Sequence, residues 1–306
     1  MHHEAVPYML RPLVPGTDTG IYVVAGTPFL YLEDSFTLVM ADLHLGFEEA
    51  ASRGLVYSLR KTGGYPAVFI PRIQLRKTVN MLKGPLNALK VKRVIINGDL
   101  KHAFDRLLRQ EREEVTELVK FLRENNVEEI VVVRGNHDNF VKPILLKLGV
   151  DFVNGISTVT RGKRVLFVHG HENVDLSEQE IVVIGHEHPS LKCFDVYRFP
   201  CYMKIPLPGG RMLVVMPATG PYHPGVVVTL TPSEYLSPLI RRQGSLKSMI
   251  ITTWIDLGEV SPRSVEYFET PELVEYIRVD RLTAGSREYA IIEFRNYDVA
   301  QLLCRL

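Results

Sequence analysis

The chain has 306 residues, of which 46% are hydrophobic and 23% are charged, and its formal net charge at pH 7 is +1. This composition is ordinary for a globular protein, and so small a charge excludes a protein that coats nucleic acid by bulk electrostatics, although it does not exclude a local basic groove. No apolar run approaches the roughly 18 residues of a membrane span, and residues 1–15 lack a basic region before an apolar core, so we expect no membrane contact, no secretory signal and a cytoplasmic location.

The N-terminal part of the chain has the pattern of β-strands. Residues 1–35 are predicted to form a β region, with apolar runs over 21–24 and 29–32 that are separated by the turn signal Gly26-Thr27-Pro28. A further strand is expected over 36–41. The chain therefore begins with strands that are joined by short turns.

Helices and strands then alternate. The segment from His44 to Pro71 is rich in Gly, Ser and Tyr, and we expect a loop there, mobile in part, that borders the functional site. Apolar residues at helical spacing predict helices over 71–90, 105–125 and 142–148. Continuous apolar runs predict buried strands over 94–97, 129–133, 164–168 and 181–184.

The β pattern returns over 193–230, and the character of the chain changes near Pro232. Two strands, over 249–257 and 289–294, and a helix over 271–279 are predicted beyond that point. Two sheets packed face to face with helices outside would suit this order of elements. We expect one domain over residues 1–231 and a small α+β appendage of unknown role over 232–306.

The three cysteines give no sign of a zinc-thiolate site or a disulfide framework. Cys193, Cys201 and Cys304 form no Cys-x-x-Cys pair. A bridge between Cys193 and Cys201 is geometrically conceivable, but two small buried thiols are the favoured interpretation.

Polar residues gather where five of the predicted strands end. Gly98 lets the chain turn sharply, so that Asp99 projects from the carboxyl end of its strand, where open α/β sheets bind ligands. Seven of the 10 histidines lie in these clusters, which ordinary core packing does not explain. The clusters are Asp42 and His44; Asp99 and His102; Asn136, His137 and Asp138; His169 and His171; His186 and His188.

Carboxylates, a carboxamide and several imidazoles form a ligand set for borderline divalent metals. They are too many for one tetrahedral zinc ion. Two ions that share a bridging aspartate would use them well, and a pair of ions roughly 3.5–4 Å apart promotes in-line displacement at phosphorus.

The motif order resembles that of the calcineurin-like metallophosphoesterases. Asp-x-His, Gly-Asp-x-x-His, Gly-Asn-His-Asp, a strand-end His-Gly and Gly-His-x-His follow one another over residues 36–190. The forms Gly-Asp-Leu-Lys-His and Gly-His-Glu-His-Pro resemble the archaeal and bacterial phosphoesterases related to Mre11/SbcD. The resemblance implies a four-layer αββα sandwich and two divalent ions, for which we expect Mn²⁺, with Fe, Zn or Co as alternatives.

The resemblance also implies roles for single residues. Asp99 would bridge the two ions, and a water activated by both ions would be the nucleophile. His137 would donate a proton to the leaving oxygen, and Asp138 would orient His137. The first ion would be held by Asp42, His44, Asp99 and His188, and the second by Asp99, Asn136, His169 and His186.

For four neighbouring residues, more than one role stays open. His102 and His171 would support the ligands or touch the substrate, although His102 suits a helix-capping or packing role equally well. Arg134 would bind phosphate, but an arginine that pairs with a surface carboxylate is the commoner outcome. His223 is interpreted as a turn residue rather than a ligand.

Three functions stay open at this point. The first is a phosphodiesterase or nuclease that acts on DNA or nucleotides, favoured by the motif forms and by basic segments at 72–77, 90–93 and 241–242, although such charges usually form a solvated surface. The second is a phosphatase or cyclic-nucleotide phosphodiesterase with a small substrate. The third is a non-catalytic binding scaffold on the same fold, because a fold alone does not establish activity. No protein partner is indicated.

Overall fold

The first of two β-sheets contains the N-terminal strands. The computed structural model describes residues 9–61, 70–223, 225–243, 245–259 and 273–305. In the first sheet, β1 to β4 are antiparallel, whereas β4 to β7 are parallel. Its seven strands lie in chain order: β1 (Leu10–Pro12), β2 (Ile21–Val24), β3 (Leu30–Leu32), β4 (Thr37–Met40), β5 (Arg93–Asn97), β6 (Glu129–Val133) and β7 (Asp151–Val153).

The second sheet has ten strands in the order β16-β17-β15-β12-β13-β10-β9-β8, with β11 beside β12 and β14 beside β11. Alternate residues of β10 serve two cores, since Ile181 and Val183 join one apolar cluster while Val182 and Ile184 join the other. The strands are β8 (Ile156–Thr160), β9 (Lys163–Phe167), β10 (Ile181–Ile184), β11 (Pro189–Cys193), β12 (Tyr197–Leu207), β13 (Arg211–Val215), β14 (Val226–Val227), β15 (Ile250–Asp256), β16 (Ile277–Ala284) and β17 (Arg287–Phe294).

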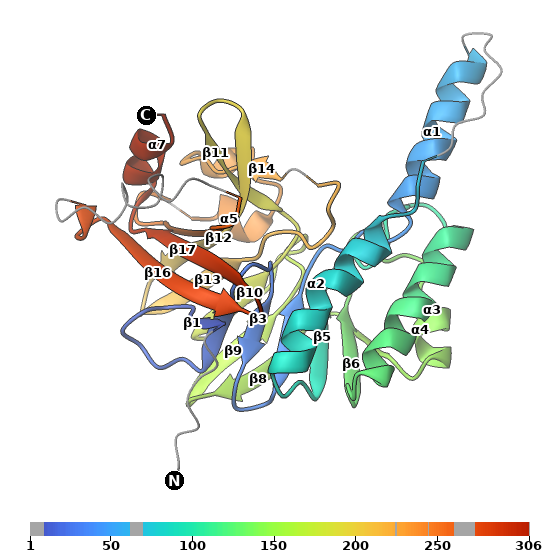
Figure 1. The fold of residues 1–306 in the computed structure, drawn as a ribbon, viewed down its shortest axis with the longest axis horizontal. Helices are drawn as coiled ribbons and strands as arrows, with labels where there is room; N and C mark the ends of the chain where they lie inside the picture. Colours follow the sequence, from blue (N-terminus) through green and yellow to red (C-terminus); the bar gives the residue numbers. More distant parts are fainter. Residues whose placement is uncertain (1–8, 62–69, 224, 244, 260–272, 306) are drawn as a thin grey trace.

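Helices cover both outer faces, so the fold is the predicted four-layer sandwich (Figure 1). α2, α3 and α4 pack on the first sheet, and α5 and α7 pack on the second. None of the helices in the described ranges is long and apolar enough to cross a bilayer. The helices are α1 (Phe47–Lys61), α2 (Gln74–Ala88), α3 (Arg109–Glu124), α4 (Lys142–Lys147), α5 (Pro238–Arg241) and α7 (Tyr297–Arg305), with a 3-10 helix at Pro232–Glu234.

The prediction of a loop between His44 and Pro71 was wrong for residues 47–61. They form α1, which stands out from the body of the molecule (Figure 1). Glu48 and Glu49 in its first turn suit the positive end of the helix dipole, and Glu49 pairs with Arg53 one turn later at 2.6 Å. Residues 62–69 lie outside the described part of the chain.

The helix predicted over 271–279 was also wrong where the structure describes it. Residues 273–276 form a turn, and β16 begins at Ile277. β16 pairs with β17 from Ile277↔Phe294 to Ala284↔Arg287. The two strands are joined by the two residues Gly285-Ser286, with Gly285 at a φ of +62°, and such a connection favours a β-hairpin. Pairing in this hairpin outweighs the helical spacing of the apolar residues.

Beyond residue 231, the strands β15, β16 and β17 extend the second sheet. β15 pairs with β12 through Cys201↔Thr253 to Lys204↔Ile250, and β17 pairs with β15. Arg11 of the first sheet joins this region through ion pairs with Asp280 at 2.9 Å and Glu293 at 3.0 Å. The division of the chain into two domains at residue 231 stays a prediction.

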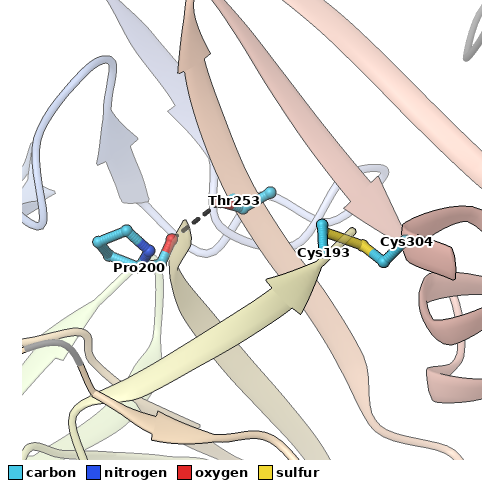
Figure 2. The surroundings of a disulfide bond; sticks show 4 residues. All are labelled: Cys193, Pro200, Thr253 and Cys304. Carbon is cyan, nitrogen blue, oxygen red and sulfur yellow. Dashed lines mark hydrogen bonds between the residues drawn. A yellow bond between two sulfur atoms is a disulfide. The ribbon is translucent and has the colours of Figure 1, made fainter. Parts of the chain in front are cut away.

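A disulfide joins Cys193 at the end of β11 to Cys304 in α7 (Figure 2). The expectation of buried thiols at Cys193 and Cys201 was therefore wrong for Cys193, and the conceivable Cys193–Cys201 bridge is not the one formed. Nearby, Thr253 donates a hydrogen bond to the carbonyl of Pro200 at 2.8 Å (Figure 2). The partner of Cys193 is 111 residues away in sequence, so sequence spacing could not reveal it. Cys201 is a buried free thiol.

We expect a thiol titration of the denatured, unreduced protein to find one reactive thiol per chain, and three after reduction, since the chain has 3 cysteines and one disulfide. Mass spectrometry of a non-reducing digest would detect the linked peptides. Three reactive thiols before reduction, in protein purified without reductant, would contradict this prediction.

Candidate metal centre

The ends of five strands meet at one edge of the sandwich. β4, β5 and β6 are parallel neighbours, so their carboxyl ends lie at the same edge of the first sheet. β9 and β10 are parallel neighbours in the second sheet. Backbone hydrogen bonds fix the loops that follow, from Asp42 N to Gly98 O at 3.0 Å, from His44 N to Asp99 O at 2.9 Å and from Gly185 N to His169 O at 3.0 Å.

The structure brings the predicted ligand residues together in two groups that share Asp99. Within each group, one ligand atom from every residue lies within 4.8 Å of the others. Asn136 joins the second group, because its Oδ1 lies 3.1 Å from Nε2 of His169. The first group is Asp42, His44, Asp99 and His188, and the second is Asp99, His169 and His186.

The backbone at these positions is strained. Of the eleven non-glycine residues with positive φ in the described ranges, five belong to the ligand set: Asp42, His44, Asp99, His186 and His188. A non-glycine residue held in such a sparsely populated conformation costs about 1–3 kcal/mol, and such residues cluster at functional sites. The local strain at this edge is therefore maintained by the surrounding fold.

Two motif glycines are required because ligand side chains cover them. A methyl group on Gly98 would lie 2.0 Å from Nδ1 of His169, and one on Gly135 would lie 2.1 Å from Oδ1 of Asp99. Any larger residue at either position would displace a predicted ligand. The glycines thus allow close approach of the ligands to the strand ends.

Pairs of imidazole nitrogens face each other inside the cluster. Nε2 of His44 lies 3.3 Å from Nε2 of His188, and Nε2 of His169 lies 3.2 Å from Nδ1 of His186. Facing ring nitrogens beside buried carboxylates direct several lone pairs into the same space. This donor set of imidazole, carboxylate and carboxamide fits borderline divalent ions.

The electrostatics of the cluster favour a cation. Burial alone would lower the pKa of His169, but the carboxylates of Asp99 and Asp42 outweigh burial and raise it to about 9. Burial would raise the pKa of Asp99, but His169 and His44 hold it below its usual range. A proton on His169 thus compensates part of the negative charge of the two buried carboxylates. A divalent ion that binds in the cluster would displace this proton.

His137 lies beside the shared carboxylate. Its backbone N donates to Oδ1 of Asp99 at 2.9 Å, and its ring Nδ1 donates to the carbonyl of His102. Nδ1 is thereby engaged in a hydrogen bond, and Nε2 is the ring nitrogen that remains for another partner. The carbonyl of His102 therefore orients the His137 ring.

Asp138 has backbone partners. Its carboxylate accepts hydrogen bonds from the backbone N of Leu100 at 2.9 Å, of Lys101 at 3.3 Å and of Gly135 at 2.8 Å. Burial, together with the charge of Asp99, raises its pKa to about 6. Asp138 thus links the loop after β5 to the loop after β6, instead of contacting the His137 ring as we had expected.

Comparison with known proteins decides the family. The model of the calcineurin-like phosphoesterases matches residues 37–208, which is more than half of the chain and includes all five motifs. The chain belongs to this family of phosphoesterases. Among curated proteins no relative matched.

Solved structures with a similar fold are distant in sequence. The nuclease MPE of Pseudomonas putida has a TM-score of 0.50 and 20% identity, and the match covers 76% of this phosphoesterase and 91% of that chain. A protein of unknown function from Aquifex aeolicus has a TM-score of 0.29 and 16% identity, covering 50% and 78% of the two chains. Vacuolar protein sorting 29 of Cryptosporidium parvum has a TM-score of 0.32 and 15% identity, covering 85% and 97%.

The rings of His102 and His171 lie beside predicted metal ligands of this phosphoesterase. The ring of His102 is 5.4 Å from that of His44 and 5.7 Å from that of His137. The ring of His171 is 5.2 Å from that of His169. Arg134, in contrast, is exposed, and its backbone N donates to the carbonyl of Val153.

His223 closes a turn, as interpreted, through a hydrogen bond from its N to Gly220 O at 3.4 Å, and its ring also lies beside the predicted ligands. Its ring stacks on His44, with 4.1 Å between ring centroids, and lies 5.1 Å from His188. Hydrogen bonds from Thr219 N to Ala41 O and from Gly220 N to Asp42 O bring this segment to the ligand loop. Nothing in the sequence around His223 signals these long-range contacts.

Sequence reasoning also missed the polar residues that support the ligand loop. The side-chain amide of Gln74, which is fully buried, donates to the carbonyls of Leu43 and His44, the latter at 2.8 Å. Glu48 accepts from the backbone N of Gln74 at 2.9 Å, and Glu114 accepts from Gly46 N at 2.8 Å. In sequence these residues belong to the polar faces of helices, so no pattern marked them as buried.

Replacing Gln74 with leucine is expected to destabilise the phosphoesterase by about 2 kcal/mol or more, because the carbonyls of Leu43 and His44 would lose their buried donor. Metal affinity should fall by about 10- to 100-fold, as when a group supporting a ligand is removed. Denaturant unfolding and metal titration would measure the two effects. Thr78→Val is a matched control, since Thr78 is fully buried on the same helix and its hydroxyl has no partner in the described part of the structure. Equal effects of both substitutions would contradict the role of Gln74.

Proposed function

We propose that this phosphoesterase is a nuclease that uses two divalent ions to hydrolyse phosphodiester bonds in DNA or nucleotides. The observation that carries the proposal is the convergence of Asp99 and six other predicted ligand side chains, with the ring of His137 beside them. The fold shared with the nuclease MPE and the forms of the motifs support nucleic acid as the substrate.

The ligand roles follow from the two groups. Asp42, His44, Asp99 and His188 would hold one ion, and Asp99, Asn136, His169 and His186 the other. When bound, the two ions supply activation of a water and charge compensation for the phosphoryl oxygens. Mn²⁺ suits the mixed imidazole and oxygen donors, which also accept Fe, Zn or Co.

The remaining steps belong to residues of the chain. As water attacks phosphorus, the bond from phosphorus to the leaving oxygen breaks, and Nε2 of His137 gives its proton to that oxygen. The carbonyl of His102 holds the ring in place for this transfer through Nδ1. Asp138 acts as a positioning residue, because it fixes the backbone on either side of the site. His171 and Arg134 would contact the substrate at the rim.

Two arginines of the predicted basic segments pair with nearby carboxylates. Arg72 pairs with Glu113 at 2.7 Å, and Arg93 pairs with Glu129 at 2.7 Å. Such pairs reduce the attraction that these segments exert on a phosphate backbone. Recognition of DNA would therefore depend on contacts close to the metal centre.

The test is a panel of single- and double-stranded DNA, a cyclic nucleotide, a phosphomonoester and an aryl phosphodiester, each with the Mn²⁺-loaded protein. We expect cleavage of DNA that EDTA abolishes, and the His137→Ala variant, purified identically, controls for contaminating nucleases. Hydrolysis of the small substrates without cleavage of DNA would reject the nuclease and favour a small-molecule phosphoesterase. Failure to hydrolyse every substrate would favour a binding scaffold.

A further inference from the structure

An exposed aromatic ring lies beside His137, the proposed general acid. Phe104, on the loop between β5 and α3, is 57% exposed. Its ring stands perpendicular to that of His137, with 5.8 Å between centroids and an interplanar angle of 88°. A group that receives a proton from Nε2 of His137 would therefore lie within reach of this ring.

The loop that carries Phe104 is fixed by buried groups. Lys101, which is fully buried, donates to the carbonyls of Ala103 and Arg106, the latter at 3.0 Å. Ala103 N donates to Glu111 at 2.5 Å, and the amide of Asn139 donates to the carbonyl of Phe104 at 3.1 Å. The backbone of this loop thus holds an apolar ring in solvent. Binding of a ligand to the ring would cost little entropy, because the loop is already ordered.

The other aromatic side chains near the site are already paired. Phe47 stacks on Tyr222, with 4.6 Å between centroids and an interplanar angle of 20°, and its ring also meets His102 at 5.0 Å. Phe104 has one ring contact in the described ranges, the edge-on contact with His137. More than half of the Phe104 surface is therefore open to a planar ligand.

We propose that Phe104 contacts the leaving group and stacks on its base, so that the enzyme prefers phosphodiesters whose departing side carries a nucleobase. This inference rests on the nuclease function proposed above. His137 defines the side of the phosphate from which the leaving oxygen departs, and Phe104 lies on that side. A base has an apolar face that the exposed ring can cover, and such stacking tolerates different base sequences.

The test uses single-stranded oligonucleotides with one cleavable phosphodiester between methylphosphonate linkages. One oligonucleotide is complete, one lacks the base on the 5′ side of the cleavable bond, and one lacks it on the 3′ side. The product without a terminal phosphate identifies the leaving side. For the wild type, we expect loss of the leaving-side base to lower kcat/KM about tenfold or more, and loss of the opposite base to have a smaller effect.

The Phe104→Leu variant keeps an apolar side chain but has no ring. It should lower kcat/KM on the complete oligonucleotide by about the same factor, with no further loss when the leaving-side base is absent. Phe104→Trp should retain the preference. Phe194→Leu is the matched control, because Phe194 is 51% exposed in the hairpin turn between β11 and β12, and it should behave as the wild type.

Binding gives a second readout that does not require turnover. With EDTA present, Phe104→Leu should weaken the binding of the complete oligonucleotide and leave that of the leaving-side abasic one unchanged. Equal losses on all three oligonucleotides, or no loss on any, would overturn the role of Phe104 while the nuclease function stands. A wild type that hydrolyses only the small phosphoesters would overturn both.

Discussion

Replacing His137 with alanine is expected to lower kcat on DNA by about 10²- to 10⁴-fold, the usual contribution of general acid catalysis, while the protein still binds both ions. The backbone N of His137, which donates to Asp99, is retained in the variant, so the shared carboxylate keeps its position. Metal content by mass spectrometry and turnover with saturating Mn²⁺ would measure the two quantities.

An aryl phosphodiester provides the control for this prediction. Its leaving group departs without a proton, so the loss in the His137→Ala variant should be much smaller on this substrate than on DNA. Equal losses on both substrates would show that His137 acts through binding or folding. Unchanged turnover on DNA would reject it as the acid.

The Asp99→Asn variant is expected to lose the pair of bound metal ions. Its activity should fall to the level measured in EDTA. An amide lacks the charge that a shared ligand of two cations needs, although its oxygen still accepts the hydrogen bond from His137 N, so the fold should persist. Metal content should fall from about two ions per chain to less than one. Mn²⁺ at 100 times its Kd should stabilise the wild type by about 2.7 kcal/mol, and the variant by much less.

The matched control is Asp256→Asn. Asp256 is a partly buried carboxylate of β15 that pairs with Arg287 at 3.2 Å, and this variant should keep its metal content and its response to Mn²⁺ in thermal unfolding. An Asp99→Asn variant that retains two ions and full turnover would show that Asp99 is not shared between them.

The strand ends were predictable because their signals are local. A β-branched run before Gly98 and Asp99 predicts a buried strand and the position of its polar end, and parallel strands bring such ends to one edge of a sheet. The same rule applies to Asp42 and to Asn136. The four layers were predicted from the resemblance in motif order. The structure agrees, because apolar clusters lie on both faces of the sheet that contains β10.

Features that depend on distant contacts escaped prediction. The Gly, Ser and Tyr residues of α1 predict a loop, but the segment forms a helix that stands out from the body with Leu55 and Tyr57 exposed. His223 reaches the site only through the pairing of residues 219 and 220 with the loop after β4. The bond between Cys193 and Cys304 closes 111 residues of chain, and spacing alone cannot identify such a pair.

The order of strands in the second sheet bears on which fragment of the chain can fold alone. The region matched by the family model ends at residue 208, immediately before β13, and β13 is the strand that connects β12 to β10. In a recombinant fragment trimmed to 37–208, the second sheet would be interrupted between β12 and β10. The first sheet would lack β1 to β3, so β4 would lose its neighbour β3. Both cuts would leave unpaired backbone edges, the usual starting points for intermolecular strand pairing and aggregation.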